Sequence, residues 1–245
     1  MAAFLSFHAP GFWLVVSLLC MLAATAAQPF LPRAWRGFVL LAVWLGVPYL
    51  ALISGGVSPR LLGLRYLDWA VTFRLGAGIL LAVAVMAGIV RLVTAGPVGN
   101  TTSAGAARRG VSLAALLRGF GWSGAEELNW CFWRGALWEL ILVAAVPIGL
   151  PAYWAVWLAA AVNLPFALLL QPNGWQRIVK AAILAVTSVV FFYTGNFWLC
   201  WLVHSVVWII LAPAVTSGAG QGQSVMANEP QATTKTPGLV KRPGA

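Results

Sequence analysis

Residues 123–140 hold three of the five acidic residues of this chain and read Ser-Gly-Ala-Glu-Glu-Leu-Asn-Trp-Cys-Phe-Trp-Arg-Gly-Ala-Leu-Trp-Glu-Leu. The stretch runs into a strongly apolar segment, yet it carries Glu126, Glu127 and Arg134. An ionised side chain at the middle of a bilayer costs about 2.5–3.5 kcal/mol on insertion scales, so it normally faces a partner or a water-filled cavity. The charges therefore indicate a functional site inside a membrane, with Arg134 as the internal counter-ion.

The composition is typical of a membrane protein. The chain is 61% hydrophobic and 8% charged, whereas a soluble domain has about 25% charged residues. Its apolar runs approach the ~20 residues that a helix needs to cross a bilayer, and they do not alternate as barrel strands would. We expect an all-α, polytopic membrane protein with about seven transmembrane helices in one bundle. The predicted spans are 11–28, 36–54, 73–95, 128–147, 152–171, 178–194 and 197–213, with 111–122 as a shorter amphipathic lead-in to the fourth.

The apolar runs and the two polar stretches divide the chain. Residues 1–57 are expected to be N-terminal transmembrane helices, and residues 58–213 the helical membrane core. Residues 96–110 lack apolar periodicity and are expected to be a linker. Residues 214–245 are rich in Gly, Ser, Thr, Pro and Gln, and cannot bury enough apolar surface to offset the entropy of ordering. This last segment is therefore predicted to be a disordered tail.

The net charge of +10 does not indicate a nucleic-acid partner, because the basic residues are scattered between the apolar spans. Such a distribution is typical of topology determinants. One side of the membrane receives Arg33, Arg36, Arg91, Arg108, Arg109, Arg118, Arg177, Lys180, Lys235, Lys241 and Arg242, and the other receives Arg60, Arg65 and Arg74. This asymmetry predicts an integral membrane protein of the plasma membrane, in contact with lipid, whose N-terminus is outside and whose C-terminus is cytoplasmic.

The spacing of the charges leaves two interpretations of the acidic pair. Glu127 and Arg134 share a helix face but lie seven residues apart, about 10 Å along the axis, so a direct contact needs extended side chains or a bridging water. Glu126 points about 100° away from Glu127, toward a neighbouring helix. The pair could cap the start of a span at the interface while Arg134 bonds a backbone carbonyl. Alternatively, the three side chains line a polar cavity with a role in chemistry or binding.

A second candidate site lies in residues 193–208, where His204 falls within an apolar span. A buried histidine is often a satisfied structural residue, although the cost of a polar group in the membrane favours a function. An imidazole can act as a base, ligate a metal or hydrogen-bond an oxyanion.

Together, these two segments resemble the CAAX prenyl protease and bacteriocin-processing family (CPBP, or Abi) of intramembrane proteases. The resemblance rests on the acidic pair before Trp133-Arg134-Gly135, on Thr194-Gly195-Asn196-Phe197-Trp198 opening a helix with His204, and on residues 61–65; it covers roughly residues 58–212. It implies a multi-helix membrane protein in which Glu and His residues activate a water that hydrolyses a peptide bond. It also implies a divalent metal such as zinc if the enzyme is active.

The chain departs from the family's motifs at several positions. If Arg134 is aligned with the motif's arginine, Asn129 and Trp130 occupy the glutamate positions, and the acidic pair lies about one turn too early. Leu170 stands where the second histidine belongs, and Trp208 where a polar residue follows the last histidine.

Three functions follow as hypotheses. The first is an intramembrane endopeptidase that cleaves membrane-associated peptides or proteins, with Glu126, Glu127, Arg134 and His204 as the catalytic set. Of these, Glu126, Glu127 and His204 could supply three metal ligands. The second is a non-catalytic relative that binds a membrane protein or lipid through the same site. The third is a small transporter or membrane assembly factor whose Glu, Arg and His residues form a proton or substrate path.

The topology is open to a direct test. A reporter domain fused after residue 215 should give a cytoplasmic signal, because the basic loops place that end inside. An exterior signal from this fusion would contradict the predicted orientation.

Overall fold

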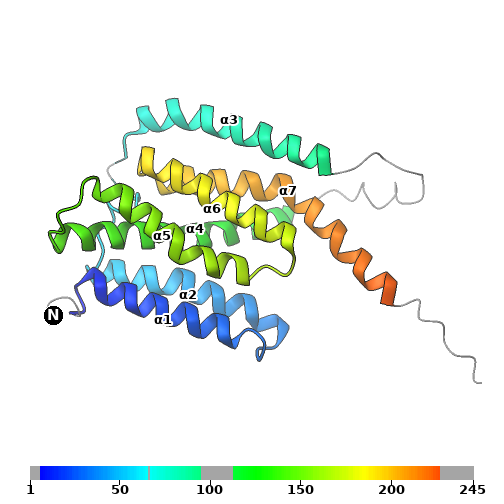
Figure 1. Cartoon of the computed structure of the whole chain (residues 1–245), viewed down its shortest axis with the longest axis horizontal. Coiled ribbons are helices and arrows are strands. Elements are labelled where there is room, and N and C mark those ends of the chain that lie inside the picture. The colour runs from blue at the N-terminus through cyan, green and yellow to red at the C-terminus, as the bar shows by residue number, and fades with distance from the viewer. Residues whose placement is uncertain (1–5, 66, 95–112, 227–245) are drawn as a thin grey trace, which may run out of the picture.

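The computed structural model describes residues 6–65, 67–94 and 113–226, and within them the chain forms seven helices and no strand (Figure 1). The helices are α1 Pro10–Ala27, α2 Arg33–Ile53, α3 Trp69–Thr94, α4 Leu113–Val143, α5 Pro151–Leu169, α6 Gly174–Thr194 and α7 Phe197–Met226. The expected all-helical fold is thereby confirmed.

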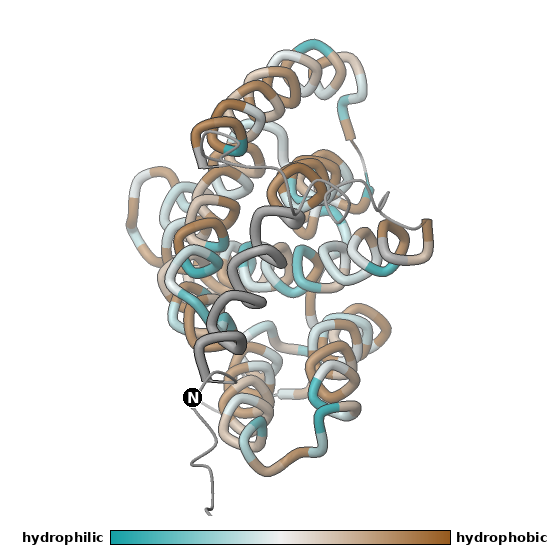
Figure 2. The backbone as a smooth tube through the Cα atoms, turned by 90° about the vertical axis from the view of Figure 1, so that its right-hand side faces the viewer, coloured by the Kyte–Doolittle hydropathy of each residue, from teal (hydrophilic) through white to brown (hydrophobic). Residues whose placement is uncertain are grey.

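Five of these helices are long and apolar enough to cross a membrane, namely α1, α2, α3, α5 and α6. The chain is therefore an integral membrane protein. Helix α4 is not among these five helices, and it carries Arg118, Glu126, Glu127, Arg134 and Glu139 along its length. Figure 2 shows hydrophobic residues along most of the helices and hydrophilic stretches in several of the turns.

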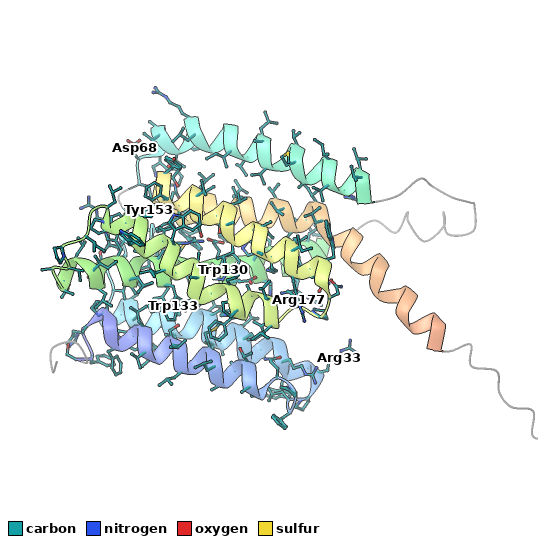
Figure 3. The ribbon with its side chains drawn as sticks, viewed as in Figure 1. Arg33, Asp68, Trp130, Trp133, Tyr153 and Arg177 are labelled. Carbon is teal, nitrogen blue, oxygen red and sulfur yellow. The ribbon has the colours of Figure 1, made fainter. Side chains whose placement is uncertain are left out.

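The helices run along a common direction, and α4 occupies the centre of the bundle. It packs against α1, α2, α5 and α7, while α6 packs against α5 and α7. The remaining helix, α3, lies at one side of the bundle against α7, and α1 and α2 lie at the opposite side (Figure 1). Arg33 and Arg177 lie toward one end of the bundle and Asp68 toward the other (Figure 3). The common end of the two arginines agrees with the side to which the sequence assigns both.

The central helix α4 differs from its prediction. Residues 111–122 were expected to be a separate lead-in and 128–147 a span, but one helix runs from Leu113 to Val143. Its 31 residues correspond to about 46 Å, more than the ~30 Å hydrocarbon core. The helix ends at Val143, shortly before Ala145, whose backbone is left-handed with φ 48°. Glu126 and Glu127 consequently lie in the middle of a helix rather than at its start.

The last helix, α7, also extends beyond its predicted span. It continues to Met226, whereas 213 was the expected end of the span and 214 the start of a disordered tail. The rest of the predicted tail and the predicted linker at 96–110 lie outside the described residues.

The start of α7 is fastened to the loop that precedes α3. The Phe197 N–H donates to the Gly63 carbonyl at 3.1 Å, and the Asn196 side chain accepts from the Trp198 N–H at 2.9 Å and donates to Thr72 of α3 at 3.1 Å. Gly63 has φ +75°, and a Cβ there would lie 2.4 Å from the carbonyl oxygen of Gly195. These contacts set the position of α7 along the bundle.

We therefore expect Gly63→Ala to destabilise the protein by at least about 1–3 kcal/mol, because the left-handed backbone and the lack of space both oppose a side chain. Thermal unfolding in detergent measures the effect. The matched control is Gly88→Ala in α3, where a Cβ meets nothing within 4 Å. Equal unfolding temperatures for the two variants would contradict the importance of this close approach.

Candidate functional site

The candidate site lies on α4 where neighbouring helices shield it from lipid. Glu126, Glu127 and Arg134 are 3%, 0% and 1% exposed, and the apolar residues between them, such as Cys131 and Phe132, are also buried. Phe132 and Trp133 pack with α1 and α2. A helix covered on all sides can carry charges that a lipid-facing helix could not.

Glu127 and Arg134 form a direct ion pair. Arg134 Nη1 donates to Glu127 Oε1 at 2.7 Å, and both side chains are fully buried. Arg134 Nη2 donates to Thr187 Oγ1 at 3.0 Å and to Ser188 Oγ at 3.2 Å, both on α6. The two extended side chains thus span two helical turns without a bridging water. Because these hydroxyls also bind the guanidinium, the pair ties α4 to α6.

The second oxygen of Glu127 contacts His204 on α7. Glu127 Oε2 lies 3.2 Å from His204 Nδ1. Trp130, which lies near the middle of the bundle in Figure 3, stacks on the imidazole with ring centroids 5.0 Å apart and planes inclined by 12°. The carboxylate and the indole together fix the orientation of the imidazole ring. Glu127, Arg134 and His204 therefore meet in one place, although none of them lines either of two pockets in the described structure.

Lys180 completes the cluster, and the sequence interpretation did not assign it to the site. It was expected to be a topology determinant near the membrane surface, but it is 2% exposed. Its Nζ donates to Glu126 Oε2 and lies 3.2 Å from His204 Nε2. Helical periodicity could have revealed it, because Lys180 lies on the same face of α6 as the buried Thr187 and Phe191.

The cluster balances its own charge. Two carboxylates, Glu126 and Glu127, face two cations, Arg134 and Lys180, with His204 between them. The interpretation of the acidic pair as an interfacial cap is wrong, because the pair lies in mid-helix and Arg134 bonds side chains. A buried ion left without its partner would be costly, so the position of each helix depends on the others.

Of the motif positions that this chain fills with other residues, Trp130 and Trp208 border the cluster, whereas Asn129 and Leu170 do not contribute to it. Asn129 donates to Asn163 of α5 at 3.2 Å, on another side of α4. Leu170 follows the last residue of α5. Trp208 packs its ring 5.0 Å from Lys180 Nζ and so borders the cluster without supplying a polar group.

An apolar groove of about 470 Å³ runs beside the cluster. Its walls come from α2, α4 and α7, and they include Tyr49, Gly121, Leu128, Phe197 and Trp201. No charged residue is among those that line it. The charged side chains therefore meet behind the groove, within the packed helices, rather than on its wall.

The candidate metal ligands are already engaged. Glu127 bonds Arg134 and His204, and Glu126 bonds Lys180. In the described part of the chain, no group of three or more His, Cys, Asp or Glu side chains could hold a metal ion. Because Glu126, Glu127 and His204 all have partners in this arrangement, they do not fit a divalent ion.

Comparison of the chain with protein-family models, with curated proteins and with solved structures finds no match.

The Glu127–Arg134 pair is expected to dominate the stability of the cluster. Arg134→Met leaves Glu127 buried without its main counter-ion and should destabilise the protein by about 3–5 kcal/mol. Adding Glu127→Gln removes the orphaned charge, so the double variant should be more stable than Arg134→Met alone. Unfolding in detergent measures both. The exposed Arg177 is the control, since Arg177→Met should change stability little. A double variant as unstable as the sum of the single variants would show that the two charges do not interact.

Proposed function

We propose that this protein is an intramembrane endopeptidase, similar in its catalytic set to the CPBP family, that cleaves membrane-associated peptides or proteins. The observation that carries the proposal is the convergence of two glutamates and a histidine in the core of the bundle, although Glu127 and His204 are 77 residues apart. Paired acid and base groups at membrane depth are what hydrolysis of a peptide bond requires.

In this proposal, Glu127 and Arg134 position the imidazole. With Glu127 as acceptor, His204 Nδ1 carries the proton and Nε2 is left as an acceptor facing Glu126 and Lys180. Arg134 holds Glu127 in place through its Nη1. The arrangement parallels the general pattern in which a carboxylate fixes the tautomer of a working histidine.

Glu126 and His204 are the groups proposed to activate water. Glu126 Oε2 and His204 Nε2 lie 3.7 Å apart, so one water on the side away from Lys180 can lie within about 2.6–3.2 Å of both. Glu126 takes a proton from this water. At the same time, the oxygen of the water bonds to the carbonyl carbon of the peptide. The C–N bond then breaks, and the proton passes to the leaving amine. The Lys180 ammonium group lies close enough to stabilise the negative charge that develops on the carbonyl oxygen.

The membrane setting and the groove support the proposed substrate class. The groove lies between α2, α4 and α7, and two of these helices carry the cluster. Its apolar walls suit the hydrophobic part of a membrane-associated chain, which could reach the buried cluster when α4 and α7 separate. The enzyme is proposed to work in the plasma membrane with its C-terminus in the cytoplasm.

A second candidate function is a non-catalytic relative that binds a membrane protein or lipid. The observation that favours it is that both glutamates of the cluster are paired and almost completely buried. Under this proposal the ion pairs serve folding, and the groove does the binding.

Substitutions that remove one functional group of the site at a time separate the two functions. Glu126→Gln removes the base, and His204→Ala removes its partner, so each should abolish proteolysis while the protein still accumulates. The measurement compares new protein N-termini in membranes from cells that express the wild type or a variant.

The control for this experiment is Glu139→Gln, also on α4. Glu139 accepts the Ser58 N–H at 2.7 Å and lies outside the cluster, so this variant should cleave like the wild type. Cleavage products that persist in both Glu126→Gln and His204→Ala would exclude the endopeptidase and favour the binding function.

A further inference from the structure

The side chain of Lys180 lies where a metal would have to bind. Its Nζ donates to Glu126 Oε2 and lies 3.2 Å from His204 Nε2. Glu126 Oε2 and His204 Nε2 themselves lie 3.7 Å apart. We propose that the Lys180 ammonium group is the built-in cation of this centre, and that it holds the position between Glu126 and His204 that a divalent ion would otherwise take.

Distances support this assignment. A zinc ion lies about 2.0–2.2 Å from carboxylate oxygen and imidazole nitrogen ligands. Glu126 Oε2 and His204 Nε2 are 3.7 Å apart, so an ion bound to both would lie between them. The Lys180 nitrogen contacts both atoms from that same space. The ion would therefore overlap with the ammonium group as well as being repelled by its charge.

The surroundings of Lys180 keep its cation in place. The side chain is 3% exposed, and its Nζ lies 5.0 Å from the centre of the Trp208 ring and 6.0 Å from that of Trp130. Aromatic faces attract a cation at such distances. Lys180 is thus held by one carboxylate, one imidazole and two indoles.

The rest of the cluster lacks a free third ligand. Glu127 is occupied by Arg134 and by His204 Nδ1, and a metal site usually needs at least three protein ligands. Lys180 accordingly acts as a positioning residue that holds the Glu126 carboxylate and the imidazole in register. This inference goes beyond the proposed function, because it concerns the charge at the centre whether or not a peptide bond is hydrolysed there.

The test uses the full-length protein in detergent and Zn²⁺ alone. The purified wild type should hold no zinc through His204, and added Zn²⁺ should not raise its unfolding temperature. Lys180→His removes the cation and adds an imidazole that can serve as the third protein ligand beside Glu126 and His204. At Zn²⁺ about ten times its Kd, the unfolding temperature of this variant should rise by about 3–5 °C.

Matched variants show whether this rise comes from the proposed position. Lys180→His combined with His204→Ala should lose the response, because only two of the three ligands remain. Lys180→Arg keeps a cation and should not respond. Arg177→Ala, at an exposed position of the same helix, controls for unspecific effects of the metal.

Two results would overturn the proposal. The first is stoichiometric zinc in the wild type that His204→Ala removes, since the metal would then bind beside Lys180. The second is a Lys180→His variant whose unfolding temperature does not respond to Zn²⁺, since three ligands are then present. If Lys180→His fails to accumulate, Lys180→Cys replaces it, because a thiolate is also a zinc ligand. Lack of response in that variant counts equally against the proposal. None of these measurements uses cleavage, so a failure of the endopeptidase hypothesis is distinguished from a failure of this one.

Discussion

The contact between Glu127 and Arg134, at 2.7 Å and without exposure to solvent, is the constraint on which the arrangement of the helices depends. Moving one ion into a protein interior costs several kcal/mol, even after relaxation, unless partners surround it. Those partners come from different helices: the hydroxyls of Thr187 and Ser188 on α6 and the imidazole of His204 on α7. Side-chain bonds therefore fix α4, α6 and α7 relative to one another.

The position of α7 along the bundle determines whether His204 can contact Glu127. The acidic pair lies one turn away from the family's motif positions, yet Glu127 still reaches His204. The start of α7 is determined by the bond from Phe197 to Gly63 and by the contact of Asn196 with Thr72. Neither contact involves a charged group. Polar contacts at the start of α7 thus set the position of His204 along the bundle, although they lie some two turns from the imidazole.

The fold could be predicted from the sequence further than the details of the site. Long apolar runs are a direct signal of membrane helices, and all seven helices fall where such runs were found. The limits of α4 were predicted poorly, because its charges break the apolar run although the helix itself continues. The same charges made the meeting of Glu127, Arg134 and His204 predictable, since none of them could face lipid.

The burial of Lys180 in the cluster could not be predicted from the sequence, and the cause is physical. A lysine near the end of a span usually extends to the membrane surface, and its long stem can reach either outward or inward. Hydropathy does not distinguish these directions. The inward direction of the Lys180 side chain depends on Glu126, a carboxylate on another helix. Lys180 reaches this carboxylate only when the helices are packed.

The burial of charge in α4 has a consequence for the synthesis of the chain. Helix α4 leaves the ribosome before its partners, since Lys180 follows Glu126 by 54 residues and His204 follows Glu127 by 77. Until then, Glu126 has no cation from another helix, and α4 is a poor substrate for the insertion machinery. Stable integration of α4 must wait for α6 and α7, so the C-terminal half of the chain acts on the biogenesis of a helix made before it.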